Sequence, residues 1–207
     1  MFTLIFKQNF IMKKIAIVVV TFIFFTSSNA QDANKFRVGL DLGIVPAKKG
    51  FGLAFFLEPK YNVKENMNIG LRLGSTAIIK NTNTSSNPIS GSLEGIGSYT
   101  GTFDYYFPNG DNFVPYIGGG VGYNQIVNVV LTDIGNQDNV NKIPNSNVIG
   151  GLIRGGFELG KFRLGLEYNF LPKTTAYTIA GSKLSDVSNS YLALNLGFYI
   201  GGGKWKR

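Results

Sequence analysis

The sequence predicts an all-β fold: an eight-stranded antiparallel up-and-down transmembrane β-barrel that follows a cleaved N-terminal signal peptide. Between Phe36 and Ile200, about eight segments alternate apolar residues with polar residues or glycines. Neighbouring side chains of a strand point to opposite faces, so each segment would have one apolar and one polar face. Nearly all charges fall on the polar face, and no helical segment is available to cover the apolar one. Lipid is therefore the expected solvent of the apolar face.

The N-terminus has the pattern of a secretory signal peptide. Met12-Lys13-Lys14 forms a basic start, residues 15–25 form an apolar run, and Ser28-Asn29-Ala30 ends in a small-x-small pattern. A transmembrane helix would need about 20 apolar residues, which is roughly twice the length of this run. We therefore expect cleavage before Gln31.

The predicted cleavage leaves a signal peptide over residues 1–30 and one barrel domain over residues 31–207. The basic start at Met12 favours translation from that position rather than from Met1. The domain keeps 17 basic and 12 acidic residues among 177 positions, a net charge of +5. These charges are dispersed along the strands, which does not favour a nucleic-acid partner. The absence of cysteine from the sequence excludes a disulfide framework, thiol chemistry and a lipoprotein-type N-terminal anchor.

The alternation and the residues that interrupt it predict eight strands. They cover residues 35–46, 50–62, 66–80, 91–107, 112–131, 146–159, 161–172 and 189–201. Each exceeds the roughly 9–11 residues that a tilted strand needs to cross a bilayer.

Short and long connections alternate along this predicted barrel, apart from the short first hairpin at residues 46–50. The longer connections are polar and rich in Asn, Ser, Thr and Asp: residues 81–90, 132–145 and 173–188. Outer-membrane barrels have short periplasmic turns and long external loops. We therefore expect these three connections outside the cell and both termini on the periplasmic side.

Charges within the strands fall on the phase that would face the barrel interior. On the opposite phase, an Arg or Lys would cost about 2–4 kcal/mol near the middle of the membrane. Five basic and six acidic residues share the interior phase: Arg37, Asp41, Glu58, Lys60, Arg72, Glu94, Asp104, Arg154, Glu158, Arg163 and Glu167. An eight-stranded barrel is just wide enough for side chains to fill. We expect a structural network of paired charges; the alternative is an ion-conducting or ligand-binding path.

Two strands carry a pattern that resembles a known superfamily. Residues 115–123 (PYIGGGVGY) look like the P-Y-x-G-x-G-x-G strand of small eight-stranded outer-membrane barrels of the OmpX/OmpA-transmembrane-domain kind. Residues 191–198 are similar to their closing strand, and the Asn, Lys and Ile usage resembles that of Bacteroidota proteins. Members commonly end on an aromatic residue that the assembly machinery reads, whereas this chain ends on Arg207. Phe198 or Trp205 would take that role. The resemblance implies a fold rather than a chemistry.

The sequence does not favour catalysis. Barrel enzymes that it resembles in fold (palmitoyltransferases, deacylases and omptin-type proteases) work through a catalytic histidine, and this sequence contains none. No nucleophile with a matching base and no metal-ligand cluster is visible. The Gly118–Gly122 run lacks the Lys-Ser or Lys-Thr of a phosphate-binding loop, and interior glycines are better explained as relief of crowding. We therefore predict no enzymatic activity, no cofactor and no metal.

The main hypothesis is a monomeric integral outer-membrane protein, exported by the signal peptide and inserted by the barrel-assembly machinery. Its partners would be membrane lipid and a surface ligand bound through loops 81–90, 132–145 and 173–188. Its role would be structural or a surface interaction. The alternative is a small OmpW-like transport barrel that passes ions or a small apolar ligand.

Overall fold

The computed structural model describes residues 33–47, 50–81, 90–108, 113–132, 140–142, 146–177 and 183–202. The predicted signal peptide over residues 1–30, the start at Met12 and the candidate assembly residue Trp205 lie outside these ranges. Within them, no helix has the length and apolar character needed to cross a membrane.

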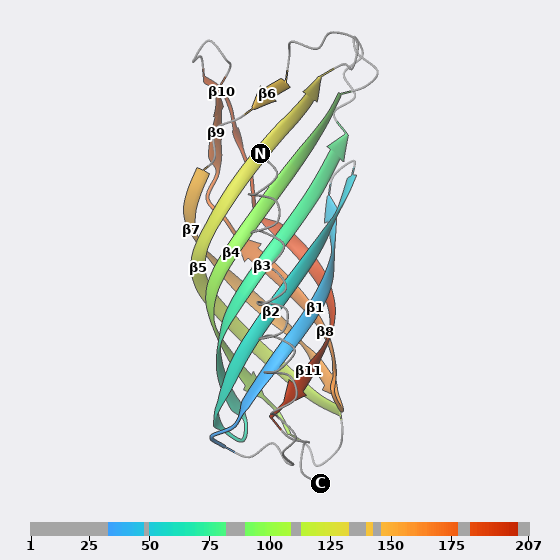
Figure 1. The fold of residues 1–207 in the computed structure, drawn as a ribbon, viewed down its shortest axis with the longest axis vertical. Helices are drawn as coiled ribbons and strands as arrows, with labels where there is room; N and C mark the ends of the chain where they lie inside the picture. Colours follow the sequence, from blue (N-terminus) through green and yellow to red (C-terminus); the bar gives the residue numbers. More distant parts are fainter. Residues whose placement is uncertain are drawn as a thin grey trace, which may run out of the picture.

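Eight long strands form a closed antiparallel barrel (Figure 1). They are β1 (Phe36–Ala47), β2 (Gly50–Lys64), β3 (Met67–Asn81), β4 (Ser90–Tyr106), β5 (Phe113–Thr132), β7 (Ser146–Leu159), β8 (Phe162–Phe170) and β11 (Tyr191–Gly201). Each pairs with its neighbour in the chain, and the pairing of β1 with β11 closes the ring. The predicted all-β, eight-stranded antiparallel barrel is confirmed.

Strand β8 shows how alternation places the side chains. From Phe162 to Phe170 the residues are exposed and buried in turn. Across the β7–β8 ladder the inward charges stand opposite each other, with Arg154 facing Glu167 and Glu158 facing Arg163. Glu158 and Arg163 form an ion pair across the ladder, and opposite charges at directly paired positions stabilise a pair of strands. The polar phase of the sequence is thus the interior of the barrel.

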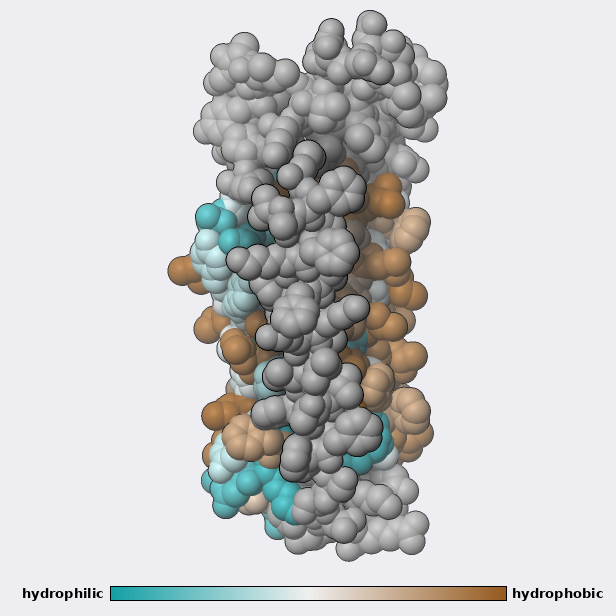
Figure 2. Space-filling model, in the orientation of Figure 1, coloured by the Kyte–Doolittle hydropathy of each residue, from teal (hydrophilic) through white to brown (hydrophobic). Residues whose placement is uncertain are grey.

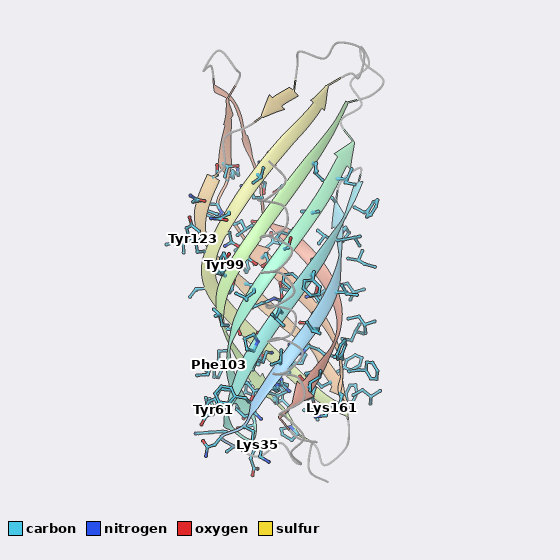
Figure 3. The ribbon with its side chains drawn as sticks, viewed as in Figure 1. Lys35, Tyr61, Tyr99, Phe103, Tyr123 and Lys161 are labelled. Atoms are coloured by element: carbon cyan, nitrogen blue, oxygen red, sulfur yellow. The ribbon has the colours of Figure 1, made fainter. Side chains whose placement is uncertain are left out.

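The outer surface of the barrel is an apolar belt (Figure 2). Large apolar side chains from all eight strands are exposed on it, far more than a soluble monomer usually shows. Aromatic rings pair near the end with the short turns: Tyr105 with Phe107 and Phe113 with Phe157, at centroid distances of 5.0 and 4.8 Å. Lys161 lies at the same end (Figure 3). An apolar band bordered by rings fits a bilayer.

The predicted longer connections contain strands of their own, which corrects the loop prediction. β6 (Val140–Lys142) pairs with the outer end of β5, and β9 (Thr174–Tyr177) pairs with β10 (Lys183–Val187) as a separate hairpin. Segments of three to five residues are too short for alternation to reveal them.

The paired region of β8 and β11 is shorter than predicted at the end where β8 stops and β11 starts. β11 starts at Tyr191, because the preceding residue, Ser190, bonds to β8 through its side chain instead of through backbone ladder hydrogen bonds. Its hydroxyl accepts from the Leu171 amide and donates to the Leu171 carbonyl, each at 3.0 Å. Leu171 therefore leaves β8, which ends at Phe170.

Candidate functional site: the barrel interior

The interior of the barrel has two levels. All eleven charged side chains singled out from the sequence are buried, with no more than 6% of any of them exposed. Most belong to the level near the short turns, because they occupy inward positions close to the β7–β8, β4–β5 and β2–β3 turns. We call this the charged level. The other level lies towards the long connections and is apolar.

The apolar level consists of inward residues at the strand ends farthest from the short turns. They are Val45, Ala54, Phe56, Ile78, Ile96, Ile126, Leu171, Tyr191 and Ala193, which pack in one cluster. The expectation that paired charges fill the lumen is therefore wrong for this part of the barrel. Alternation could not reveal it, because these strand ends carry apolar residues on both phases. The signal was present in the inward β-branched residues Val45, Ile78, Ile96 and Ile126.

Arg154 is the centre of the charged level. Its Nε and Nη2 donate to Asp104 at 2.8 and 2.9 Å, and its Nη1 and Nη2 donate to Glu58 at 3.0 and 2.6 Å. The Lys60 ammonium lies 2.5 Å from Asp104 and 3.2 Å from Glu58. Thr102 adds a hydroxyl donor to Glu58 at 2.6 Å. Two carboxylates therefore share two cations, which is the arrangement that makes buried charges tolerable.

Glu158 joins strands β1 and β8 to this centre. It accepts from Arg37 Nη1 and Nη2 at 3.0 and 2.9 Å, and from Arg163 Nε and Nη2 at 3.2 and 3.0 Å. The Tyr106 hydroxyl also donates to Glu158 at 3.0 Å. Arg163 Nη1 lies 3.5 Å from Glu58. Seven charged residues from five strands (β1, β2, β4, β7 and β8) thus form one network.

Arg72 and Glu167 form a separate ion pair. Glu167 also accepts from the Asn169 amide at 2.9 Å, and the Arg72 guanidinium lies 3.6 Å from the centroid of the Phe56 ring. Because Phe56 belongs to the apolar cluster, this pair connects the two levels.

Asp41 and Glu94 do not belong to either group. Glu94 lies opposite Ile78 in the β3–β4 ladder and is therefore at the apolar level. Asp41 is 3% exposed, and it makes no hydrogen bond or ion pair with any described residue. The structure thus places nine of the eleven predicted charges in the ion pairs described above, and Glu94 has a further interaction outside them.

Sequence reasoning missed the uncharged members of the network. Thr102 and Tyr106 flank Asp104 on the same phase of β4, and Asn169 follows Glu167 on the same phase of β8. Their positions on the charge-bearing phase were the available signal, because residues i and i+2 of a strand share a face.

Inward glycines make room for these side chains. A Cβ on Gly118 would collide with the Asp104 carboxylate, and one on Gly197 would collide with the Asp41 carboxylate. A Cβ on Gly165 would meet the Tyr116 hydroxyl. Gly118 therefore relieves crowding, which is the role predicted for glycines on the lumen phase.

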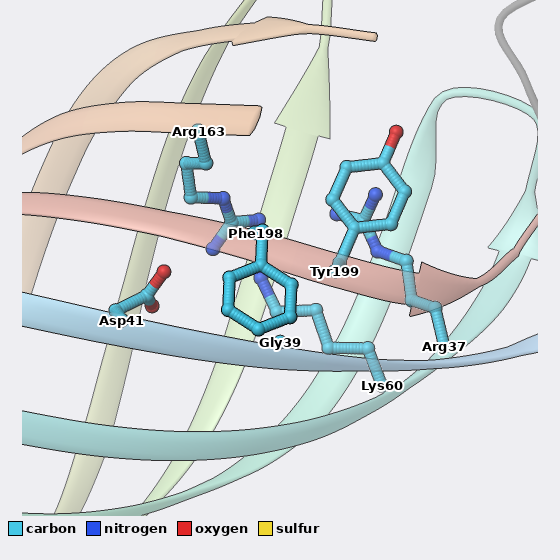
Figure 4. A pocket seen from close by; sticks show the side chains of 7 residues that line it. All are labelled: Arg37, Gly39, Asp41, Lys60, Arg163, Phe198 and Tyr199. Atoms are coloured by element: carbon cyan, nitrogen blue, oxygen red, sulfur yellow. The ribbon is translucent and has the colours of Figure 1, made fainter. Parts of the chain in front are cut away.

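The described interior offers little free space. A cavity of about 10 Å³ lies between Arg37, Asp41, Lys60 and Arg163 in the charged level (Figure 4). This is about the volume of a single water. The described residues also contain no cluster of three or more acidic side chains that could hold a metal ion.

No known family model matches this chain, and no curated protein matches it. Three solved structures are similar to it at 14% identity. Neisserial surface protein A has a TM-score of 0.46 over 80% of this chain and 95% of its own. OprG from Pseudomonas aeruginosa has a TM-score of 0.49 over 84% and 100%. The N-terminal β-barrel domain of Pseudomonas aeruginosa OprF has a TM-score of 0.41 over 81% and 98%. The barrel assignment depends on the strand pairing described above.

Proposed function

We propose that this chain is a non-enzymatic integral outer-membrane protein whose barrel is a closed anchor for its external segments. The observation that carries the proposal is the filled interior, with an apolar cluster above an ion-paired network. A barrel of eight strands leaves space only for side chains, and here they occupy it. The apolar belt supplies the membrane contact, and the barrel-assembly machinery would insert it.

The closed interior argues against a transport role. A conducting path needs polar groups along its whole length, and ions would have to cross the apolar level formed by Phe56, Ile78, Ile96 and Ile126. At the charged level, the guanidinium and carboxylate groups are already bound to each other. The transport alternative therefore lacks a route in the described part of the chain.

Silence in planar bilayers is the expected result for the purified protein. The apolar level excludes hydrated ions, so no steady single-channel openings should appear at any applied voltage. The triple variant Phe56→Ala/Ile78→Ala/Ile126→Ala removes most of that level and tests whether it is the seal. Steady openings of the unmodified protein would overturn the proposal and favour the transport alternative.

The external segments are where a surface interaction would occur. The connections after β3, β5 and β8 all leave the same end of the barrel, opposite the short turns (Figure 1). At this end, β6 pairs with β5, and β9 and β10 form a separate two-stranded sheet (Figure 1). Polar, variable loops that are positioned by a rigid scaffold are where proteins commonly bind their partners. We propose a surface ligand there, bound by a monomer. The Bacteroidota-type assignment stays a prediction.

Epitope tags test which end faces outward. Tags inserted near Asn83, Asn136 and Gly181 should be stained on intact cells, whereas a tag at Asn109 should require permeabilised cells. The physical reason is that position 109 follows β4 in the sequence and precedes β5, and the strand ends that flank it lie at the opposite end of the barrel from the end of β3, the end of β5 and the β9–β10 pair, which flank the other three positions (Figure 1). Staining of the Asn109 tag alone on intact cells would mean an inverted barrel and would remove the surface-interaction proposal.

A further inference from the structure

Strand β7 has a ladder partner on only one side at its outer end. Its pairing with β5 runs from Leu159 to Ser146, whereas its pairing with β8 stops at Gly151, which lies opposite Phe170. Residues 146–150 therefore have β5 on one side and no paired strand among the described residues on the other. They begin β7 at the end of the barrel with the long connections (Figure 1).

The direction of the backbone groups shows which residues face the open side. In an antiparallel ladder, the N–H and C=O of one residue point to the same neighbouring strand, and those of the next residue point to the opposite one. The Leu171 amide and carbonyl point to the β11 side. Phe170 therefore directs its own amide and carbonyl to its partner Gly151 on β7. In steps of two from Gly151, the backbone groups of Ile149 and Asn147 point to the open side.

The chain after β8 does not continue this ladder. Pro172 would stand opposite Ile149 if the register continued, but proline has no N–H to donate. Its carbonyl accepts instead from the side-chain amide of Asn189 at 2.8 Å, and Asn189 is 1% exposed. The same amide donates to the Thr174 hydroxyl at 3.1 Å. A buried side chain thus binds this segment to its own hairpin rather than to β7, and the edge of β7 stays open.

The open edge lacks the features that normally protect a strand edge. Proteins block such edges with Lys, with Pro, with bulges or with a covering segment. Residues 146–150 (SNVIG) carry no charge and no proline, and their register with β5 is continuous. Ile149 is 76% exposed, and Val148 packs against the apolar cluster. An uncharged edge with free donors and acceptors is a template to which an extended chain can add.

We propose that the edge of β7 at Asn147 and Ile149 binds an extended, uncharged peptide segment of a surface partner by strand addition. Main-chain hydrogen bonds to these two residues supply the affinity, and an apolar side chain beside Ile149 adds contact. The inference rests on the proposed function for the side of the membrane on which the partner is met. Binding to the purified protein tests the edge itself, whereas tag staining tests the orientation, so the two can fail separately.

The test measures the binding of a fluorescent peptide to the purified protein in phospholipid vesicles by anisotropy. The peptide copies residues 122–128 (GYNQIVN), because residues 122–126 already pair with the same stretch of β7 on its other side. Ile149→Pro removes the free N–H and no bond to β5, as edge strands tolerate proline, and should weaken binding at least about tenfold. Ile149→Ala keeps the N–H and should weaken binding less than about threefold, because main-chain bonds carry the affinity.

Three results would contradict the proposal. The first is no binding of the peptide to the unmodified protein. The second is an equal loss for Ile149→Pro and Ile149→Ala, which would indicate an apolar side-chain site instead of strand addition. The third is a dimer of the unmodified protein that Ile149→Pro abolishes, which would make a second copy of this chain the occupant of the edge.

Hydrogen exchange of the unmodified protein decides the question should Ile149→Pro fail to give the folded form on unboiled gels. The amides of Asn147 and Ile149 should exchange quickly in the protein alone and slowly once the peptide is bound. The amide of Val148 points to β5 and should be protected in both states. Unchanged exchange at Asn147 and Ile149 in the presence of the peptide would rule out strand addition at this edge.

Discussion

Replacement of Arg154 by alanine should destabilise the folded barrel by about 3–5 kcal/mol, because it breaks a buried ion-paired network. The side chain makes four hydrogen bonds to Glu58 and Asp104, and both carboxylates are buried. After the substitution, Lys60 and the more distant Arg163 would remain as the cations close to both acids. Urea unfolding in vesicles, followed by the loss of the fast-migrating form on unboiled gels, measures the change.

The neighbouring residue provides the control for this substitution. Ile153 lies on the same strand with 57% of its surface exposed to the membrane side. Ile153→Ala also truncates the side chain to Cβ, but lipid can fill the space, so its cost should be much smaller. A larger effect at Ile153 than at Arg154 would mean that the inside and outside of the barrel are exchanged.

Gly156→Ala should have the second large effect, about 3 kcal/mol or more, because the added methyl collides with backbone. Its Cβ would strike the Leu164 carbonyl oxygen and would lie 2.7 Å from the Gly165 Cα across the β7–β8 ladder. Backbone atoms in a ladder cannot rotate away as a side chain would, so the two strands must separate. The folded fraction on unboiled gels, measured after refolding into vesicles, should fall sharply.

Gly155→Ala is the matched control for the same measurement. Gly155 is the adjacent residue and faces outward, where its Cβ would meet the Tyr116 carbonyl at an ordinary 3.6 Å. The methyl adds apolar surface to the lipid-facing wall, so the folded fraction should stay unchanged. Equal losses for both variants would show that glycine is needed here for backbone conformation and not for space.

The eight wall strands could be predicted from the sequence because period-two alternation continues for nine or more residues in each. The same alternation identified the interior charges, since lipid forbids them on the other phase. β6, β9 and β10 could not be found in this way, because segments of three to five residues do not establish a period.

The contents of the interior were only half predictable. Arg154 and Glu158 could be placed inside from their phase, but their partners depend on strand register and barrel closure, which alternation does not supply. Phe56 and Ile126 have apolar neighbours on the outer phase, so alternation alone did not mark them as interior.

The pairing of β1 with β11 sets the order of events during assembly. The Arg37–Glu158 pair joins residues 121 positions apart, and the ladder from Arg37 to Ile44 requires the last strand of the chain. Hairpins such as β2–β3 can form locally, but the two outermost strands keep unpaired edges until synthesis and export are complete. Such edges invite pairing with other chains, and long-range closure is slow. A chain truncated before Tyr191 should therefore aggregate rather than form a smaller barrel.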